Sequence, residues 1–235
     1  ITMLPDGPIL AKVYGEIVPV AAAGTAMIDC STVDVESARE AAQMAAAAGL
    51  LPVDAPVSGG VGGAAAGTLT FMAGGSAEAF AKAAPLFETM GQKAVHCGEA
   101  GAGQAAKICN NMILGATMAV TCEAFALADR LGLDRARMFD VVSTSSGFSW
   151  SMNTYCPAPR VGPTSPADNG YKPGFAATLM LKDLGLSQQA AEAVGADTPM
   201  GARAAALYAE FVAGDEEGRD FSALLPWFSA RSRQD

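Results

Sequence analysis

Lys107 is the residue whose surroundings are best suited to acid–base chemistry. It stands one helical turn before Asn111, and its neighbours Ala105, Ala106 and Ile108 are apolar. Burial among such side chains disfavours the charged amine and lowers a lysine pKa from about 10.4 toward neutrality, as a general base requires. Asn111 could then hold a hydroxyl or carbonyl oxygen beside the amine. A lysine whose charged end reaches water, next to a structural asparagine, explains the pattern equally well.

Two glycine-containing segments precede Lys107. In Ser58-Gly59-Gly60, after the apolar run 51–57, glycines would let backbone amides turn toward an anion, and the serine adds a hydroxyl donor. An ordinary turn after a strand explains the same local pattern. The segment Gly98–Gly103 lacks the Gly-x-Gly-x-x-Gly order of a nucleotide-binding turn. It therefore predicts close packing at the start of a helix.

Further candidates lie later in the chain. Lys182, which precedes Asp183 in an apolar helical pattern, could reach a cofactor or lower the pKa of Lys107 by repulsion between like charges. The alternative is an ion pair between Lys182 and a nearby carboxylate. Trp150 lies in a loop with Phe148, and these aromatic side chains could line a small pocket or simply pack.

Composition excludes several classes of function. Of the 235 residues, 51% are hydrophobic, enough for one large core or two modest ones. The net charge of −9 disfavours nucleic acid and anionic membrane as partners, and no apolar stretch is expected to reach the length of a membrane span. A single histidine, His96, argues against a metal site. Five cysteines without metal-like spacing predict reduced thiols and a cytoplasmic location.

The first 97 residues alternate short apolar runs with helical patterns, which indicates an open, largely parallel sheet covered by helices. The run 69–72 follows the glycine-rich turn 62–67 too closely for a helix between them and predicts an antiparallel strand. Expected strands are 1–4, 26–30, 51–57, 69–72 and 94–97, and expected helices are 9–19, 35–48 and 77–90.

From residue 104 the pattern becomes helical. A long apolar helix is expected over 104–131, with Gly132 as its C-terminal cap. The segment 143–174 contains five prolines and predicts a long functional loop. Further helices are expected over 134–143, 175–194, 201–213 and 222–228. The chain therefore divides into an α/β domain, residues 1–98, and an all-α domain, residues 99–235, which includes the long helix.

Several of these segments, in this order, resemble the β-hydroxyacid dehydrogenase family over essentially the whole chain. The matching stretches are Asp54–Gly60 with Gly67–Gly75, Gly98–Asn111 and Gly174–Gly185. Within this family, the chain most closely resembles the members that oxidise 3-hydroxyisobutyrate. The segments that carry this likeness are Ser145–Trp150, Tyr155–Pro157 and Ser165–Ala167.

The resemblance implies a Rossmann-type N-terminal domain joined by a long interdomain helix to an all-α C-terminal domain. It implies catalytic roles for Lys107 and Asn111, and substrate binding by Ser58, Gly59, Gly60 and Trp150. The cofactor contacts that it implies are Leu4, Pro5, Thr32, Phe175, Lys182 and Asp183.

The activity that the resemblance implies is NAD-dependent oxidation of 3-hydroxyisobutyrate, or a close 3-hydroxy acid, to its semialdehyde, in a homodimer or homotetramer. NADP is an alternative cofactor, because the family's cofactor-selecting strand and Gly-x-Gly-x-x-Gly turn, about 60 residues, have no counterpart here. We therefore expect a truncated or incompletely recorded chain. The alternatives are a tartronate semialdehyde reductase, an inactive fragment or a non-catalytic scaffold.

Overall fold

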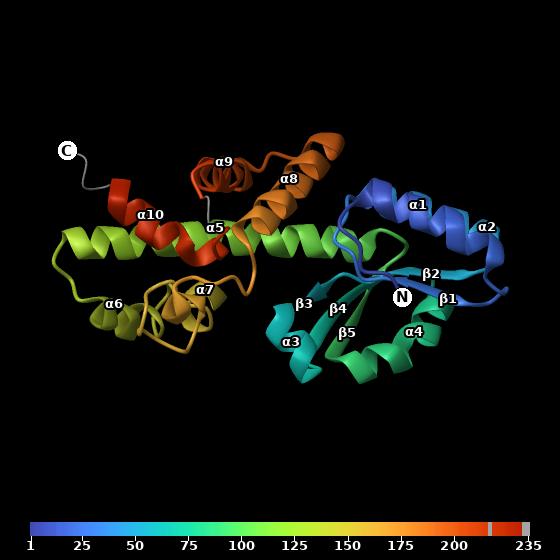
Figure 1. Ribbon diagram of the computed structural model, residues 1–235, viewed down its shortest axis with the longest axis horizontal. Coiled ribbons are helices and arrows are strands. Elements are labelled where there is room, and N and C mark those ends of the chain that lie inside the picture. The colour runs from blue at the N-terminus through green and yellow to red at the C-terminus, as the bar shows by residue number, and fades with distance from the viewer. Residues whose placement is uncertain (216–217, 232–235) are drawn as a thin grey trace. The chain divides into compact units, whose positions relative to one another are not determined.

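A computed structural model describes residues 1–215 and 218–231, which divide into two compact units, residues 1–110 and 111–235 (Figure 1). The expected order of an α/β part followed by a helical part is confirmed. The first unit contains α1 (Gly7–Ile17), the 3₁₀ turn η1 (Val18–Val20), β1 (Ala26–Asp29), α2 (Val35–Ala47), β2 (Leu51–Asp54), β3 (Val57–Ser58), α3 (Gly60–Ala66), β4 (Leu69–Gly74), α4 (Ala77–Met90), β5 (Gly91–Gly98) and the start of α5 (Ala102–Arg130).

The sheet of the first unit is mixed. Its strands follow the order β1-β2-β4-β3, and β5 also pairs with β4. The pairs β1–β2 and β4–β5 are parallel, whereas β4 runs antiparallel to β2 and β3, as expected for the run 69–72. The strand expected over 51–57 is divided at Ala55 and Pro56, because a proline has no N–H to donate to a sheet.

Helices cover both faces of this sheet, with α1 and α2 on one face and α4 on the other (Figure 1). Side chains alternate along β1 accordingly: Met27 packs in the core under α1 and α2, and Ile28 packs with Phe87 of α4. Asp34 and Ser76 cap the first turns of α2 and α4 through their side-chain oxygens. Alternate side chains of β1 therefore face the two helical layers that cover the sheet.

Two expectations for this unit are wrong. Residues 1–4 do not form a regular strand, since Thr2 makes only an isolated parallel bridge to Asp29. The glycine-rich stretch before β4 is not merely a turn, because α3 fits between β3 and β4 with seven residues. Gly67 ends that helix in the left-handed conformation, which lets β4 begin two residues later.

The second unit is helical and is built on the main part of α5, with α8, α9 and α10 on one side of it and α6 and α7 on the other (Figure 1). Close packing between α5 and α8 depends on Gly115, where a Cβ would come within 3.1 Å of Leu184 and Met180. The further elements are α6 (Arg135–Val142), α7 (Trp150–Asn153), the 3₁₀ turn η2 (Pro166–Asn169), α8 (Ala177–Val194), α9 (Pro199–Ala213), the 3₁₀ turn η3 (Phe221–Ala223) and α10 (Leu224–Arg231).

Helix α5 contradicts the expectation that no apolar stretch reaches the length of a membrane span. Its 29 residues are long and apolar enough to cross a membrane by length and composition. Half of its most apolar window is buried inside the fold, and the core helix of a soluble protein has the same length and hydropathy. Burial against the other helices of its own unit accounts for the apolar character of Met118, Cys122 and Phe125.

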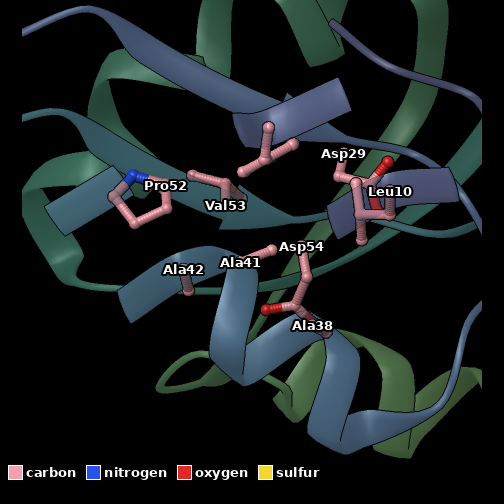
Figure 2. Close-up of a pocket in the computed structure, with 9 residues that line it drawn as sticks. Leu10, Asp29, Ala38, Ala41, Ala42, Pro52, Val53 and Asp54 are labelled. Atoms are coloured by element: carbon pink, nitrogen blue, oxygen red, sulfur yellow. The ribbon is translucent and has the colours of Figure 1, made fainter. Parts of the chain in front are cut away.

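A small cavity lies between α1, α2 and the strands β1 and β2, and the Asp29 and Asp54 side chains line it (Figure 2). One carboxylate oxygen of Asp29 accepts hydrogen bonds from Thr2 and Ser31, whereas Oδ2 is buried and has no hydrogen-bond partner among the residues that the structure describes. Burial raises the pKa of Asp29 above its ordinary value, against the opposing effect of these hydrogen bonds.

Asp29 is therefore expected to make stability depend on pH. An acid whose folded-state pKa is raised stabilises the fold when it is protonated, and this contribution is lost as the pH rises through the folded pKa. In Asp29→Asn, which keeps the accepting oxygen, urea unfolding should show a free energy that increases relative to wild type between pH 4 and pH 7. A constant difference between the two proteins across this range would contradict the assignment.

Candidate active site

The Lys107 side chain lies in the first unit, near the start of α5. Only 8% of the residue is exposed, and Nζ donates a hydrogen bond of 2.7 Å to the backbone oxygen of Val57. Val57 immediately precedes Ser58, so the amine lies at the turn that the sequence indicated as an anion site. The alternative of a lysine whose charged end reaches bulk water does not describe this side chain.

The turn itself has a backbone that only glycine adopts readily. Gly59 and Gly60 have φ angles of +131° and +61°, and both residues are exposed. A Cβ at Gly59 would also lie 3.1 Å from a methyl group of Leu69. Ser58 ends β3, and Gly60 begins α3. The chain thus leaves the sheet beside Lys107 and exposes backbone where a carboxylate can approach.

The start of α5, which positions Lys107, is fixed by Asp54. This buried carboxylate accepts hydrogen bonds from the amides of Gly101, at 2.7 Å, and Gln104, at 2.9 Å. Burial raises the pKa of Asp54, and these amides oppose the rise. Gly103 packs directly on the sheet, because a Cβ there would lie 2.2 Å from the Met72 oxygen. The close packing expected from the segment Gly98–Gly103 is confirmed.

In the second unit, Asn111 is held by a buried acid. Its Nδ2 donates a 2.6 Å hydrogen bond to Oδ2 of Asp183, a residue that is 3% exposed, and Nζ of Lys182 lies 3.4 Å from the other oxygen. A carboxylate only accepts, so it selects the NH₂ end of the Asn111 amide. The structure thus gives Asp183 a link to a predicted catalytic residue, while the predicted cofactor contacts of Lys182 and Asp183 stay predictions.

The predicted cofactor contacts of the first unit lie at the carboxyl ends of parallel segments. Leu4 and Pro5 follow the bridge at Thr2, and the Leu4 amide donates to Oγ of Ser31 at 2.7 Å. Thr32 follows β1 and is partly exposed. Nicotinamide dinucleotides bind outside the carboxyl ends of strands in such sheets. These residues therefore fit one end of that cofactor.

Aromatic side chains gather in the second unit. The Trp150 ring stacks on Tyr155 with centroids 4.9 Å apart, and Phe221 contacts both Tyr155 and Phe175. Trp150 is 49% exposed, so about half of its surface remains accessible despite the stack. The residue that sequence reasoning missed here is Asp220, which is fully buried and bonded to Tyr155. An aspartate directly before the last helical segment, as an N-cap, was its only sequence signal.

Sequence profiles of two enzyme families match the chain. Residues 1–98 match the NAD-binding domain of 6-phosphogluconate dehydrogenase. Residues 101–228 match the profile described as NAD-binding of NADP-dependent 3-hydroxyisobutyrate dehydrogenase.

Individual proteins are similar over most of the chain. The 3-hydroxyisobutyrate dehydrogenase of Pseudomonas aeruginosa is 51% identical, over 94% of this chain and 72% of its own length. The NAD-dependent L-serine dehydrogenase of the same organism is 47% identical, over 91% of this chain and 72% of its own. The Mycobacterium tuberculosis 3-hydroxyisobutyrate dehydrogenase, whose structure was solved with L-serine, is 48% identical to this chain. The two structures superpose with a TM-score of 0.92, over 96% of this chain and 77% of the other chain.

These similarities agree with the arrangement described above: an α/β domain, a long helix that carries a buried lysine, and a helical domain. The chain therefore belongs to the 3-hydroxyisobutyrate dehydrogenase family, a group of nicotinamide-dependent β-hydroxyacid dehydrogenases.

Proposed function

We propose that this chain oxidises 3-hydroxyisobutyrate to its semialdehyde with NAD, with Lys107 as the general acid and base. The observation that carries the proposal is the buried Lys107 amine, held 2.7 Å from the Val57 oxygen at the Ser58 turn. Family membership supplies the reaction class. The geometry supplies a proton-transferring group beside an exposed backbone turn that suits a carboxylate.

Lys107 removes the proton from the substrate hydroxyl during oxidation and returns it to the aldehyde oxygen in reverse. The hydrogen bond to Val57 directs one N–H toward the backbone, which orients the remaining amine positions. Asp183 fixes the amide of Asn111, so that Asn111 presents a defined polar group to the same hydroxyl. Each residue is thus positioned before substrate binds, which lowers the entropic cost of reaching the transition state.

The backbone at Ser58, Gly59 and Gly60 would hold the substrate carboxylate, and Trp150 would contact the rest of the substrate. The residues expected to hold the cofactor are Leu4, Pro5, Thr32, Phe175, Lys182 and Asp183. A nicotinamide dinucleotide bound by these residues would supply the hydride acceptor for the oxidation. NAD rather than NADP is proposed on the likeness to one relative, the NAD-dependent L-serine dehydrogenase of Pseudomonas aeruginosa.

Comparison of three substrates tests the proposal. 3-Hydroxyisobutyrate carries a methyl group where L-serine carries an ammonium and glycerate a hydroxyl, and the stacked Trp150 and Tyr155 rings suit the methyl. We expect kcat/KM with NAD to be about 10–100-fold higher for 3-hydroxyisobutyrate, the range of discrimination that one methyl group gives in an apolar pocket. L-Serine is the second candidate, because a 47% identical relative is an L-serine dehydrogenase. If kcat/KM were higher for L-serine or for glycerate than for 3-hydroxyisobutyrate, the proposed substrate would be wrong.

We further propose a functional boundary between residues 98 and 99, which the extents of the two matched profiles support. The protein is also proposed to be a cytoplasmic homodimer or homotetramer. Ile113, Val120 and Leu127 are exposed on α5 at intervals of seven residues, which places them on one face of the helix. Covering this stripe with a second copy would remove apolar surface from water. Light scattering that gave a monomer mass at micromolar concentration would refute the oligomer.

A further inference from the structure

Asp220 is a buried carboxylate that takes no part in the reaction proposed above. Its Oδ2 accepts three hydrogen bonds, from the Tyr155 hydroxyl at 2.9 Å and from the amides of Gly174 and Phe175 at 3.0 Å each. Its Oδ1 accepts two more, from the amide and the hydroxyl of Ser222. Asp220 therefore joins three segments that are distant in the sequence.

The segments that Asp220 joins carry predicted ligand contacts. Tyr155 supports the stacked ring of Trp150, the predicted substrate contact, and Phe175 is a predicted cofactor contact. Phe221 packs against both Tyr155 and Phe175, and the Phe221 amide donates to the Phe175 oxygen at 3.0 Å. Displacing Asp220 would thus move both predicted contacts at once.

The site requires a carboxylate rather than an amide. Both oxygens of the Asp220 side chain face hydrogen-bond donors, and a carboxylate can accept at both oxygens. An asparagine has one accepting oxygen and one NH₂ group, so either orientation would direct N–H bonds toward at least one backbone N–H. The mismatch would fall inside a fully buried site, where an unmatched polar group is costly.

The loop before α8 is held in a conformation that needs such an anchor. Tyr171 has a φ angle of +61°, a region that bulky residues rarely adopt, and its oxygen accepts a 2.9 Å hydrogen bond from the Asp220 amide. Gly174 leaves room for the Tyr155 hydroxyl, which would lie 2.7 Å from a Cβ at this position. Backbone and side chain of Asp220 thus fix the same loop at two points.

We propose that Asp220 is a positioning residue that holds the Trp150–Tyr155 stack in register with Phe175, and so sets the binding of both substrate and cofactor. The inference rests on the proposed function only for the identity of those ligands. The positioning itself concerns this chain alone and can be measured without turnover.

The test uses Trp150 as a fluorescent reporter in a Trp227→Phe background, which leaves one tryptophan. Asp220→Asn should shift the Trp150 emission to longer wavelength and increase its quenching by acrylamide about twofold, as expected when a stacked ring gains exposure to water. Tyr155→Phe and Gly174→Ala should shift the emission in the same direction, because each removes or displaces the hydroxyl bonded to Asp220.

Asp215→Asn is the matched control. Asp215 is also a nearly buried carboxylate that accepts from a backbone amide, but its partners, the amide and the guanidinium of Arg219, are local. This variant should lower the melting temperature and leave Trp150 emission unchanged. Equal effects of Asp215→Asn and Asp220→Asn on quenching would reduce Asp220 to a structural residue and overturn the proposal.

Kinetics supply the second readout. Asp220→Asn should raise KM for 3-hydroxyisobutyrate and for NAD by about tenfold each, because Trp150 and Phe175 would both be displaced, with a smaller change in kcat. A fall in kcat alone would overturn the positioning role.

If wild type turns over none of the hydroxy acids, the proposed function fails, whereas the fluorescence result still decides the role of Asp220. If Asp220→Asn does not fold, Tyr155→Phe and Gly174→Ala decide it by the same two readouts.

Discussion

Lys107→Met is expected to lower kcat for oxidation of the hydroxy acid by roughly 10²–10⁴-fold, the usual contribution of a general base. Methionine keeps the length and apolar character of the side chain but cannot accept the hydroxyl proton. The hydrogen bond to Val57 is lost as well. Steady-state kinetics of the purified variant, with NAD binding measured separately by calorimetry, would show a loss of turnover with cofactor affinity retained.

Two controls make this experiment specific. Lys93→Met removes an exposed lysine of β5 and should leave kcat unchanged, which separates a local effect from the loss of one positive charge. In Lys107→Ala, added methylamine should restore part of the activity, because a free amine can occupy the vacated space and accept the proton. Turnover within a few-fold of wild type in Lys107→Met would remove Lys107 from the mechanism.

Gly103→Ala is expected to lower the free energy of unfolding by about 3 kcal/mol, at the upper end of the usual cost of overpacking. The new Cβ would lie 2.2 Å from the Met72 oxygen and 2.5 Å from the Asp54 oxygen. Both are backbone atoms of the sheet, so the helix itself must move away. Urea unfolding of the two proteins measures the difference.

Gly15→Ala is the matched control for this substitution. Gly15 lies inside α1, and a Cβ added there would meet no neighbouring side chain or loop within 4 Å, so alanine should stabilise the helix by about 0.5–1 kcal/mol. The same chemical change thus has opposite effects in two helices of the first unit. An equal or favourable effect of Gly103→Ala would show that α5 does not depend on close contact with the sheet.

Loss of activity in Gly103→Ala would follow from the same displacement. Gly103 lies one turn before Lys107, and the Asp54 carboxylate that holds the start of α5 would lie 2.8 Å from the new Cβ. The distance from the Lys107 amine to the Val57 oxygen therefore depends on the packing of this glycine.

Much of the fold is predictable from local patterns. Short apolar runs located β1 and β4, helical patterns located α2 and α4, and a long stretch of helix formers located α5, each to within a few residues. Short elements were harder to predict: α3 is rich in glycine, which has low helix propensity, and forms between two strands that fix its ends. Residues 1–4 have the composition of a strand but only one bridging partner.

The sequence by itself placed Lys107 and Asn111 one turn apart on an apolar helix, after a Ser-Gly-Gly turn, and its resemblance to β-hydroxyacid dehydrogenases predicted catalytic roles for both residues. Only the tertiary structure decided which groups hold them: Val57 for Lys107, Asp183 for Asn111, and Asp220 for the Trp150–Tyr155 stack. The physical reason is that residue type and spacing specify faces of helices and strands, whereas hydrogen bonds between residues 50 to 72 positions apart arise only after those faces pack.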